Sequence, residues 1–128
     1  MLFRSDVPGE SQPFPVAINR TDVIAGYANN GNGTETGFVR AADGTITTFD
    51  AQGSAAYAYS INAKGAITGE WFDANDVPHG FVRSAKGKIK SFDPPGAILT
   101  EPWSINDNGV IAGDFADSNG YHGFIRTP

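Results

Sequence analysis

The sequence contains no cysteine, which excludes disulfide bonds, thiol catalysis and cysteine-ligated metal sites. It also lacks any run of roughly 18 apolar residues, so no segment has the composition of a membrane-spanning helix and we expect no membrane partner. The first residues, Met1 to Asp6, lack the apolar stretch of a secretion signal. We therefore expect either an intracellular chain or one whose signal was removed, and the compartment stays open.

Basic residues are few and scattered. Nine Lys and Arg stand against fourteen Asp and Glu, which gives a net charge of −5. The densest basic group is Lys86, Lys88 and Lys90, whose alternate spacing places all three on one solvated face of a strand. Because binding to phosphates requires a denser positive surface, we expect no nucleic-acid partner.

Turn-forming and aromatic residues are abundant by contrast. The 128 residues include sixteen glycines and eight prolines, and 12% are aromatic. This composition is typical of many short strands joined by tight turns, and no segment has a helical pattern. The length suits one domain with a modest core.

The strongest pattern is a repeat of about 43 residues in nearly three copies. One Ile-Asn pair marks the same point in each copy: Ile18-Asn19, Ile61-Asn62 and Ile105-Asn106. A Gly-Phe pair, with an arginine two places after the Phe, follows in each copy: Gly37-Phe38 with Arg40, Gly80-Phe81 with Arg83, and Gly123-Phe124 with Arg126. A period of this size indicates stacked or radially arranged copies of one small unit.

Each unit reads as four antiparallel strands. In the middle copy we predict strands over 57–62, 66–72, 79–83 and 88–93, separated by turns. Ile89 and Phe92 are three residues apart, so strict alternation fails and we expect a bulge or bend in the fourth strand.

The phase of the copies suggests how the ends of the chain meet. The units span about 10–53, 54–96 and 97–128 of a single domain. The third lacks a fourth strand, while residues 1–9 parallel the fourth strand of the middle copy, since Asp6, Asp50 and Asp93 each precede a Gly by three. We expect strand 1–9 to complete the last unit and to cover an exposed sheet edge.

Three motifs carry a resemblance to a known family. They are Ser-Ile-Asn-x-x-Gly-x-Ile-x-Gly at 104–113, His-Gly-Phe-x-Arg at 79–83, and Gly-x-Ile-x-x-Phe-Asp-x-Pro-Gly at 87–96. The chain resembles the bacterial HAF-type extracellular repeats over nearly its whole length, and departs from them at Thr36 and Asp22. The resemblance implies an all-β propeller with one four-stranded blade per repeat, and it suggests secretion. It implies no definite activity.

Three units are too few to close a propeller, which uses about four to eight blades. Two copies could assemble a six-bladed ring, the chain could be part of a longer array, or the fold could be a β-trefoil. We favour the homodimer with six blades, because the phase of the repeats suits ring closure. The β-trefoil is the main alternative, since threefold chains of this size fit it well.

Two sets of repeated polar residues have structural explanations. Arg40, Arg83 and Arg126 recur with Asp6, Asp50 and Asp93, which predicts one buried ion pair per unit. The asparagines that precede the hairpin turns are predicted to bond the turn backbone through their side chains: Asn19, Asn62 and Asn106.

Aromatic and acidic residues at varying positions of the repeat are the candidates for binding. Tyr59 and Trp103 occupy matching positions, as do Glu70 and Asp114, and Trp71 follows Glu70. Aromatic faces beside carboxylates are a common way to hold a sugar, because rings stack on C–H faces and acids accept hydrogen bonds from hydroxyls. The alternative for each residue is packing between blades.

Metal binding has weaker support. His79 and His122 occupy matching positions in different units, too far apart to share one ion. We expect each to bond a neighbouring loop, and a role in a ligand pocket is the alternative. The loops beginning at Asp73 and Asp117 start like calcium loops but lack the downstream glutamate, and Asx turns explain them. We expect no metal and no cofactor.

These observations favour a non-catalytic, lectin-like binding module on an oligomeric scaffold. The first alternative is a structural or protein-interaction scaffold without a small ligand. The second is a hydrolase with Glu70 and Asp114 as a carboxylate pair, although no catalytic motif supports it. We therefore predict that the chain is not an enzyme.

Overall fold

The structure is a computed structural model that describes Arg4 and residues 6–128. These residues form eleven strands and no helix, arranged as three antiparallel sheets, none of them closed. The first sheet contains β1 (Gln12–Ile18), β2 (Ile24–Asn29), β3 (Glu35–Arg40) and β4 (Ile46–Phe49). The second contains β5 (Ala56–Ile61), β6 (Ile67–Phe72), β7 (Pro78–Arg83) and β8 (Ile89–Phe92). The third contains β9 (Leu99–Ile105), β10 (Ile111–Asp117) and β11 (Gly120–Arg126).

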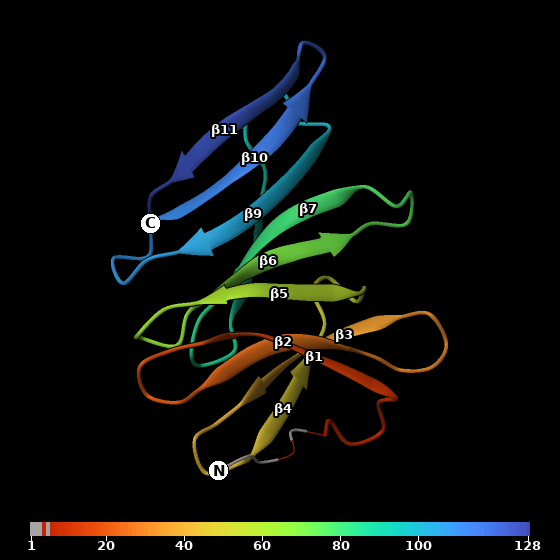
Figure 1. Ribbon diagram of the computed structural model, residues 1–128. Coiled ribbons are helices and arrows are strands. Elements are labelled where there is room, and N and C mark those ends of the chain that lie inside the picture. The colour runs from red at the N-terminus through yellow and green to blue at the C-terminus, as the bar shows by residue number, and fades with distance from the viewer. Residues whose placement is uncertain (1–3, 5) are drawn as a thin grey trace.

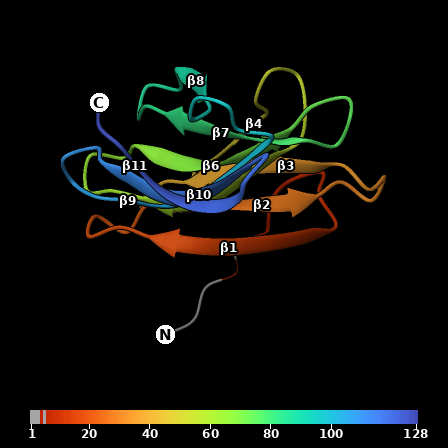
Figure 2. The same ribbon diagram turned by 90° about the horizontal axis from the view of Figure 1, so that it is seen from above.

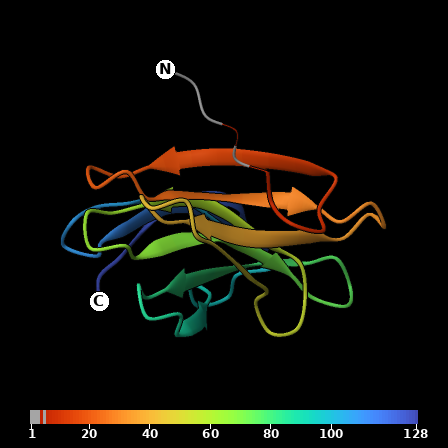
Figure 3. The same ribbon diagram turned by 90° about the horizontal axis from the view of Figure 1, so that it is seen from below.

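The sheets follow one another along the molecule, from the first at one end to the third at the other (Figure 1). Seen from above, β1 lies on the side of the molecule opposite to β4 and β8 (Figure 2). Seen from the end of the first sheet, β1, β2 and β3 lie side by side (Figure 3). The all-β prediction is confirmed. The number of propeller blades and the size of the repeat are not established by this arrangement.

The asparagine prediction is confirmed in each sheet. Asn62 Oδ1 accepts hydrogen bonds from the backbone N–H of Lys64 and Ala66, at 3.0 and 2.9 Å. Asn19 and Asn106 bond the backbone in the same way, two and four residues on. Each side chain therefore closes the turn that follows its strand.

The same side chains also join one sheet to the next. Asn19 Nδ2 donates to the carbonyl of Asn62 over 3.0 Å, and Asn62 Nδ2 donates to the carbonyl of Asn106 over 2.9 Å. Asn62 is almost completely buried. Because a buried amide without partners is costly, these bonds fix where neighbouring sheets meet.

The core lies between the sheets and consists of small and aromatic side chains. Phe81 is fully buried in a cluster with Ile61 and Ile67, and alanines from β2 and β5 complete it. Phe38 is fully buried in a second cluster, with Val7 and Ala28. The alanines allow sheets to approach closely, and the phenylalanines fill the remaining space.

Two glycines are required by close approach of an aromatic ring. A Cβ placed on Gly37 would lie 2.5 Å from Cζ of Phe49, and one placed on Gly80 would lie 2.7 Å from Cζ of Phe92. Each Phe belongs to the fourth strand of its sheet and covers a glycine of the third. Any side chain at either glycine would displace the ring.

The predicted bulge in the fourth strand is wrong. β4 and β8 pair with their neighbours without a shift of register, whereas the first strand of each sheet does shift. The residues left without a cross-strand partner at these shifts, called the bulge residues below, are Val16, Tyr59 and Trp103. The spacing of Ile89 and Phe92 was misleading, because Phe92 lies over Gly80 instead of continuing an alternating face.

The predicted Arg–Asp ion pairs are also wrong. The guanidinium of Arg83 lies 4.9 Å from the ring centroid of Phe49, and that of Arg126 lies 4.8 Å from the ring of Phe92. Asp50 instead accepts from the N–H of Gly53. A partly buried guanidinium can rest on a ring face, which avoids the desolvation of two ions at once.

The predicted role of strand 1–9 falls partly on residues 1–3 and 5, which lie outside the described residues. Val7, within this segment, packs on the first sheet against Ala28 and Phe38. Among the described residues, β11 pairs only with β10, and no sheet closes into the barrel that a β-trefoil requires. No helix long and apolar enough to cross a membrane occurs in the described part of the chain.

Replacing Asn62 with Ala should lower the free energy of unfolding by about 2–4 kcal/mol, because it removes two turn bonds and one bond between sheets from a buried site. Asn30→Ala is the matched control: its side chain accepts two backbone hydrogen bonds within one loop and bonds no other sheet, so we expect a loss of about 1 kcal/mol. Urea denaturation measures both. Equal losses would contradict the role of the bond between sheets.

Candidate functional site

A row of aromatic rings crosses all three sheets. Its members, called the aromatic row below, are Phe14, Tyr27, Tyr57, Tyr59 and Trp103. Successive ring centroids are 5.0, 4.9, 6.5 and 5.1 Å apart in that order. Tyr59 and Trp103 stack with an angle of 27° between their planes, although they belong to different sheets. The row therefore forms one continuous surface feature.

The row arises from the first two strands of each sheet. Cross-strand partners are Phe14 with Tyr27 in the first sheet and Tyr57 with Glu70 in the second. In the third sheet the same place is taken by Glu101, paired with Asp114. The bulge residues Tyr59 and Trp103 stand beside these pairs, because a bulge turns a side chain out of the regular alternation.

Carboxylates hold two of the rings. The hydroxyl of Tyr59 donates to Oε1 of Glu70 over 2.5 Å, and the indole N–H of Trp103 donates to Oδ1 of Asp114. Glu70 is only 7% exposed, and its Oε2 has no hydrogen-bond partner among the described residues. The rings are thus fixed in place, and one buried acceptor is left unused.

The acids of this site influence one another. Burial raises the pKa of Glu70, the hydrogen bond from Tyr59 partly offsets that, and the charge of Asp114 raises it further. Burial, a hydrogen bond with Asp114 and that residue's charge also raise the pKa of Glu101. Burial and the neighbouring Glu70 raise the pKa of Tyr59, so the phenol stays protonated and remains a donor.

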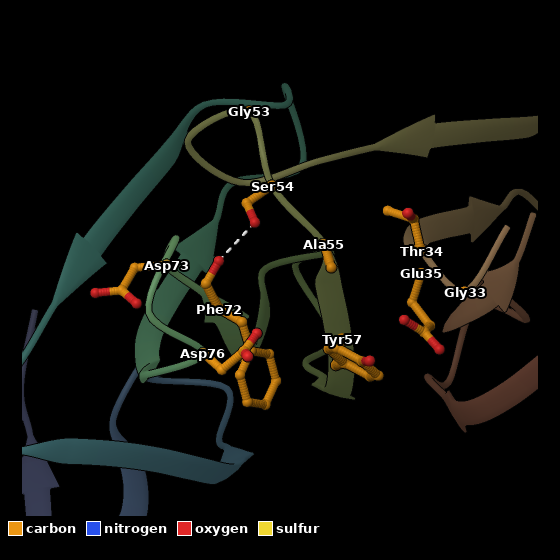
Figure 4. Close-up of a pocket in the computed structure, with 10 residues that line it drawn as sticks. All are labelled: Gly33, Thr34, Glu35, Gly53, Ser54, Ala55, Tyr57, Phe72, Asp73 and Asp76. Atoms are coloured by element: carbon orange, nitrogen blue, oxygen red, sulfur yellow. Dashed lines mark hydrogen bonds between the residues drawn. The ribbon is translucent and has the colours of Figure 1, made fainter.

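A groove of about 490 Å³ opens beside Tyr57, between the first and second sheets (Figure 4). Its lining combines two aromatic rings, Tyr57 and Phe72, with carboxylates such as Glu35 and Asp76. On one wall of the groove the Ser54 hydroxyl donates to the Phe72 carbonyl over 2.5 Å, and Glu35 lies on the other side (Figure 4). Because Tyr57 belongs to both, the groove continues the aromatic row toward the loops.

Four of the predicted site residues come together here: Tyr59, Trp103, Glu70 and Asp114. Trp71 does not join them. Its ring stacks on His79 at 4.7 Å, and its N–H donates to the hydroxyl of Ser91. Trp71 follows Glu70 in the same strand, and alternation along the strand places the two side chains on opposite faces.

The predicted histidines make local contacts. His79 lies between Asp93 and Asp73, at 2.8 and 3.3 Å, and these hydrogen bonds raise its pKa although burial lowers it. His122 lies 3.0 Å from Asp117 and 5.2 Å from the Phe115 ring centroid. Neither histidine lies in the aromatic row.

No group of three or more His, Cys, Asp or Glu suited to a metal ion occurs in the portion that the structure describes. Asp73 Oδ1 accepts from the N–H of Asn75 and Val77, and Asp117 Oδ1 accepts from that of Asn119. The Asx-turn interpretation of both loops is thereby confirmed.

Sequence reasoning missed four contributors to the site: Phe14, Tyr27, Tyr57 and Glu101. The repeat contained the signal, since Phe14, Tyr57 and Glu101 occupy one position of the unit, and Tyr27 shares that of Glu70 and Asp114. The cross-strand register that brings both positions together could not be read without locating the bulge.

Comparison with known proteins adds no relative. No family model matches the chain, and no curated protein matches it. The likeness to HAF-type repeats therefore remains a resemblance in motifs.

The glutamate in the site should destabilise the fold when it ionises. Because the folded-state pKa of Glu70 is raised, the unfolded state releases its proton first, and stability is lost as the pH rises above the unfolded value. Glu70→Gln cannot ionise and can still accept from Tyr59. We expect the variant to gain stability over the wild type as the pH rises from about 4 to 8, measured by urea denaturation.

Asp73→Asn is the control of opposite sign. The backbone N–H groups of Val77 and Asn75 lower the pKa of Asp73, so its ionised form stabilises the fold and that stability is lost as the pH falls. The free energy of unfolding of the Asn variant, relative to that of the wild type, should therefore fall as the pH rises. A Glu70→Gln difference that does not vary with pH would contradict the burial of this charge.

Proposed function

We propose that the chain is a non-catalytic carbohydrate-binding module, and that a sugar binds along the aromatic row. The observation that carries the proposal is the state of Trp103. The residue is 48% exposed, although its ring stacks on Tyr59 and its N–H is bonded to Asp114. A large apolar ring that is fixed in position and still accessible suits stacking on the C–H face of a sugar.

The carboxylates complement that ring. Hydroxyl groups of a sugar need acceptors, and the partly exposed Glu101 and Asp114 supply carboxyl oxygens at the Trp103 end of the row. Because Tyr59 and Asp114 already hold the indole, little side-chain entropy remains to be lost on binding. Several rings in succession favour an oligosaccharide over a single sugar.

One observation bears on the hydrolase alternative. Glu101 and Asp114 form a carboxyl pair with raised proton affinity at Glu101, as an acid catalyst needs. Glu101 and Asp114 are, however, cross-strand partners in the third sheet, which places their Cβ atoms about 4.5–5.5 Å apart. Glycosidases separate their carboxyls by roughly 5–9.5 Å to admit the sugar and water. This close pairing favours binding over catalysis.

Trp103→Ala should weaken oligosaccharide binding at least roughly fivefold, since the loss of one stacked ring costs about 1 kcal/mol or more. The probes are cellohexaose, chitohexaose and xylohexaose, chosen after a glycan array and titrated by calorimetry. Trp71→Ala is the matched control: that tryptophan packs on His79 away from the row, so affinity should not change.

Binding that depends on Trp71 and not on Trp103 would place the ligand elsewhere. A wild-type chain that binds no glycan on the array would reject the carbohydrate proposal and leave the scaffold alternative.

A further inference from the structure

The first sheet has an exposed apolar end face, whereas the equivalent faces of the second and third sheets are covered. Ile18 is 63% exposed, whereas Ile61 and Ile105, at the same point of the later sheets, are 8% and 6% exposed. Ile61 packs in the cluster that includes side chains of the first sheet, such as Ala25. The apolar end of β1 therefore lacks the preceding sheet that β5 has.

The third sheet has the opposite end uncovered. Phe49 and Phe92 lie over Gly37 and Gly80, but a Cβ on the matching Gly123 would meet only a backbone oxygen at 3.9 Å. Ile125, on the same strand, is 76% exposed. In the other two sheets a Phe of the fourth strand covers the equivalent glycine. Among the described residues, no fourth strand lies beside β11.

The hydrogen bonds between sheets stop at the same two ends. Asn19 and Asn62 each donate from Nδ2 to the asparagine carbonyl of the next sheet. Asn106 bonds its own turn through Oδ1, and its Nδ2 has no partner in the described ranges 4 and 6–128. The carbonyl of Asn19 is occupied by the N–H of Asp22 alone, among these residues. One free donor and one free acceptor of the series remain.

The way the chain enters the first sheet identifies the segment that could fill the gap. Ala51 follows Asp50 at the end of the first sheet and is fully buried in the cluster around Phe81. Val7 follows Asp6 and is 2% exposed in the cluster around Phe38. Val7 therefore has the same position relative to the first sheet as Ala51 has relative to the second. In the case of Ala51, the chain reaches this position on leaving the fourth strand of the preceding sheet.

We propose that a second copy of this chain packs its first sheet on the third sheet of the first copy and brings the segment that ends at Asp6 beside β11. The exposed Ile18 face and the free Asn19 carbonyl of one copy meet the Gly123 face and the free Asn106 amide of the other. A partner of different sequence would not supply this matched set of contacts.

This interface is heterologous, because two different surfaces meet. Such contacts build either a closed ring or an open filament. Radial sheet arrays close with about four to eight sheets, and six is the multiple of three in that range. The second copy therefore closes the ring, and the assembly is a dimer with two identical interfaces.

Closure would also extend the aromatic row. Tyr27 of the first sheet packs on Tyr57 of the second at 4.9 Å. The same relation at the new interface sets Asp114 of one copy against Phe14 of the other. The proposal does not depend on carbohydrate binding, and assembly is measured without any ligand.

Gly123→Val tests the interface. The free chain has room for the added side chain, and a β-branched residue suits a strand, but it occupies the place of the fourth strand's ring. Light scattering and sedimentation should give twice the 13.5 kDa chain mass for the wild type and 13.5 kDa for the variant. Lys90→Val, at an exposed position of β8, is the matched control and should remain dimeric.

Ile18→Glu tests the opposite face with a residue whose exposure makes the substitution tolerable. It should also give a monomer, with an unchanged circular dichroism spectrum. A mixture of the two variants should form a heterodimer, because one of its two interfaces combines an intact first sheet with an intact third sheet. Wild type that stays monomeric, a Gly123→Val variant that stays dimeric, or wild type that grows into filaments would overturn the proposal.

Discussion

The structure depends on one side chain that performs two tasks at once. An asparagine at the end of each first strand uses its oxygen to close the local turn. In the first two sheets its nitrogen also reaches the backbone of the next sheet. A shorter or differently branched polar residue could not supply a fixed acceptor and a fixed donor in these two directions. Turn geometry and sheet spacing are therefore coupled, and a change in one would disturb the other.

Because asparagine fixes the sheets at one end of the first strands, the middle of those strands is free to vary. The bulge residues Val16, Tyr59 and Trp103 lie there, outside the regular alternation. A bulged side chain does not occupy one of the alternating positions that fill the core, so its chemistry can differ without disturbing the core. This explains how a constant scaffold presents valine, tyrosine and tryptophan at one position, and why the candidate site forms along this line.

The sequence predicted the features that follow from local rules. Strands of the middle unit and the asparagine turns were visible because Gly, Asn and alternating apolar residues determine them locally. The bulge and the arginine contacts were not, because both depend on packing across sheets. Arg83 could pair with Asp50 or rest on Phe49, and only the position of the neighbouring sheet decides between them.

Within the site, the four residues predicted together were recognisable as aromatic and acidic variation in a regular repeat. Trp71 was predicted with them but lies on the other face of its strand, and the sequence did not reveal this because the register was not known. Both histidines bond carboxylates of neighbouring loops, as the first of the two interpretations predicts.

The electrostatics of the site give a reason to assign it a function. Glu70 is buried beside Asp114 and is not neutralised by a cation among the described residues, so its ionised form is costly. The equivalent position of the first sheet holds the aromatic residue Tyr27. Because the repeat accepts an aromatic ring at this position, the fold does not require the desolvated acid of the second sheet, and costly groups of this kind are common at functional sites. A sugar that stacks on Trp103 and donates hydrogen bonds to Asp114 would weaken the repulsion between Asp114 and Glu70, which connects the cost of this charge in the free protein to the binding that we propose.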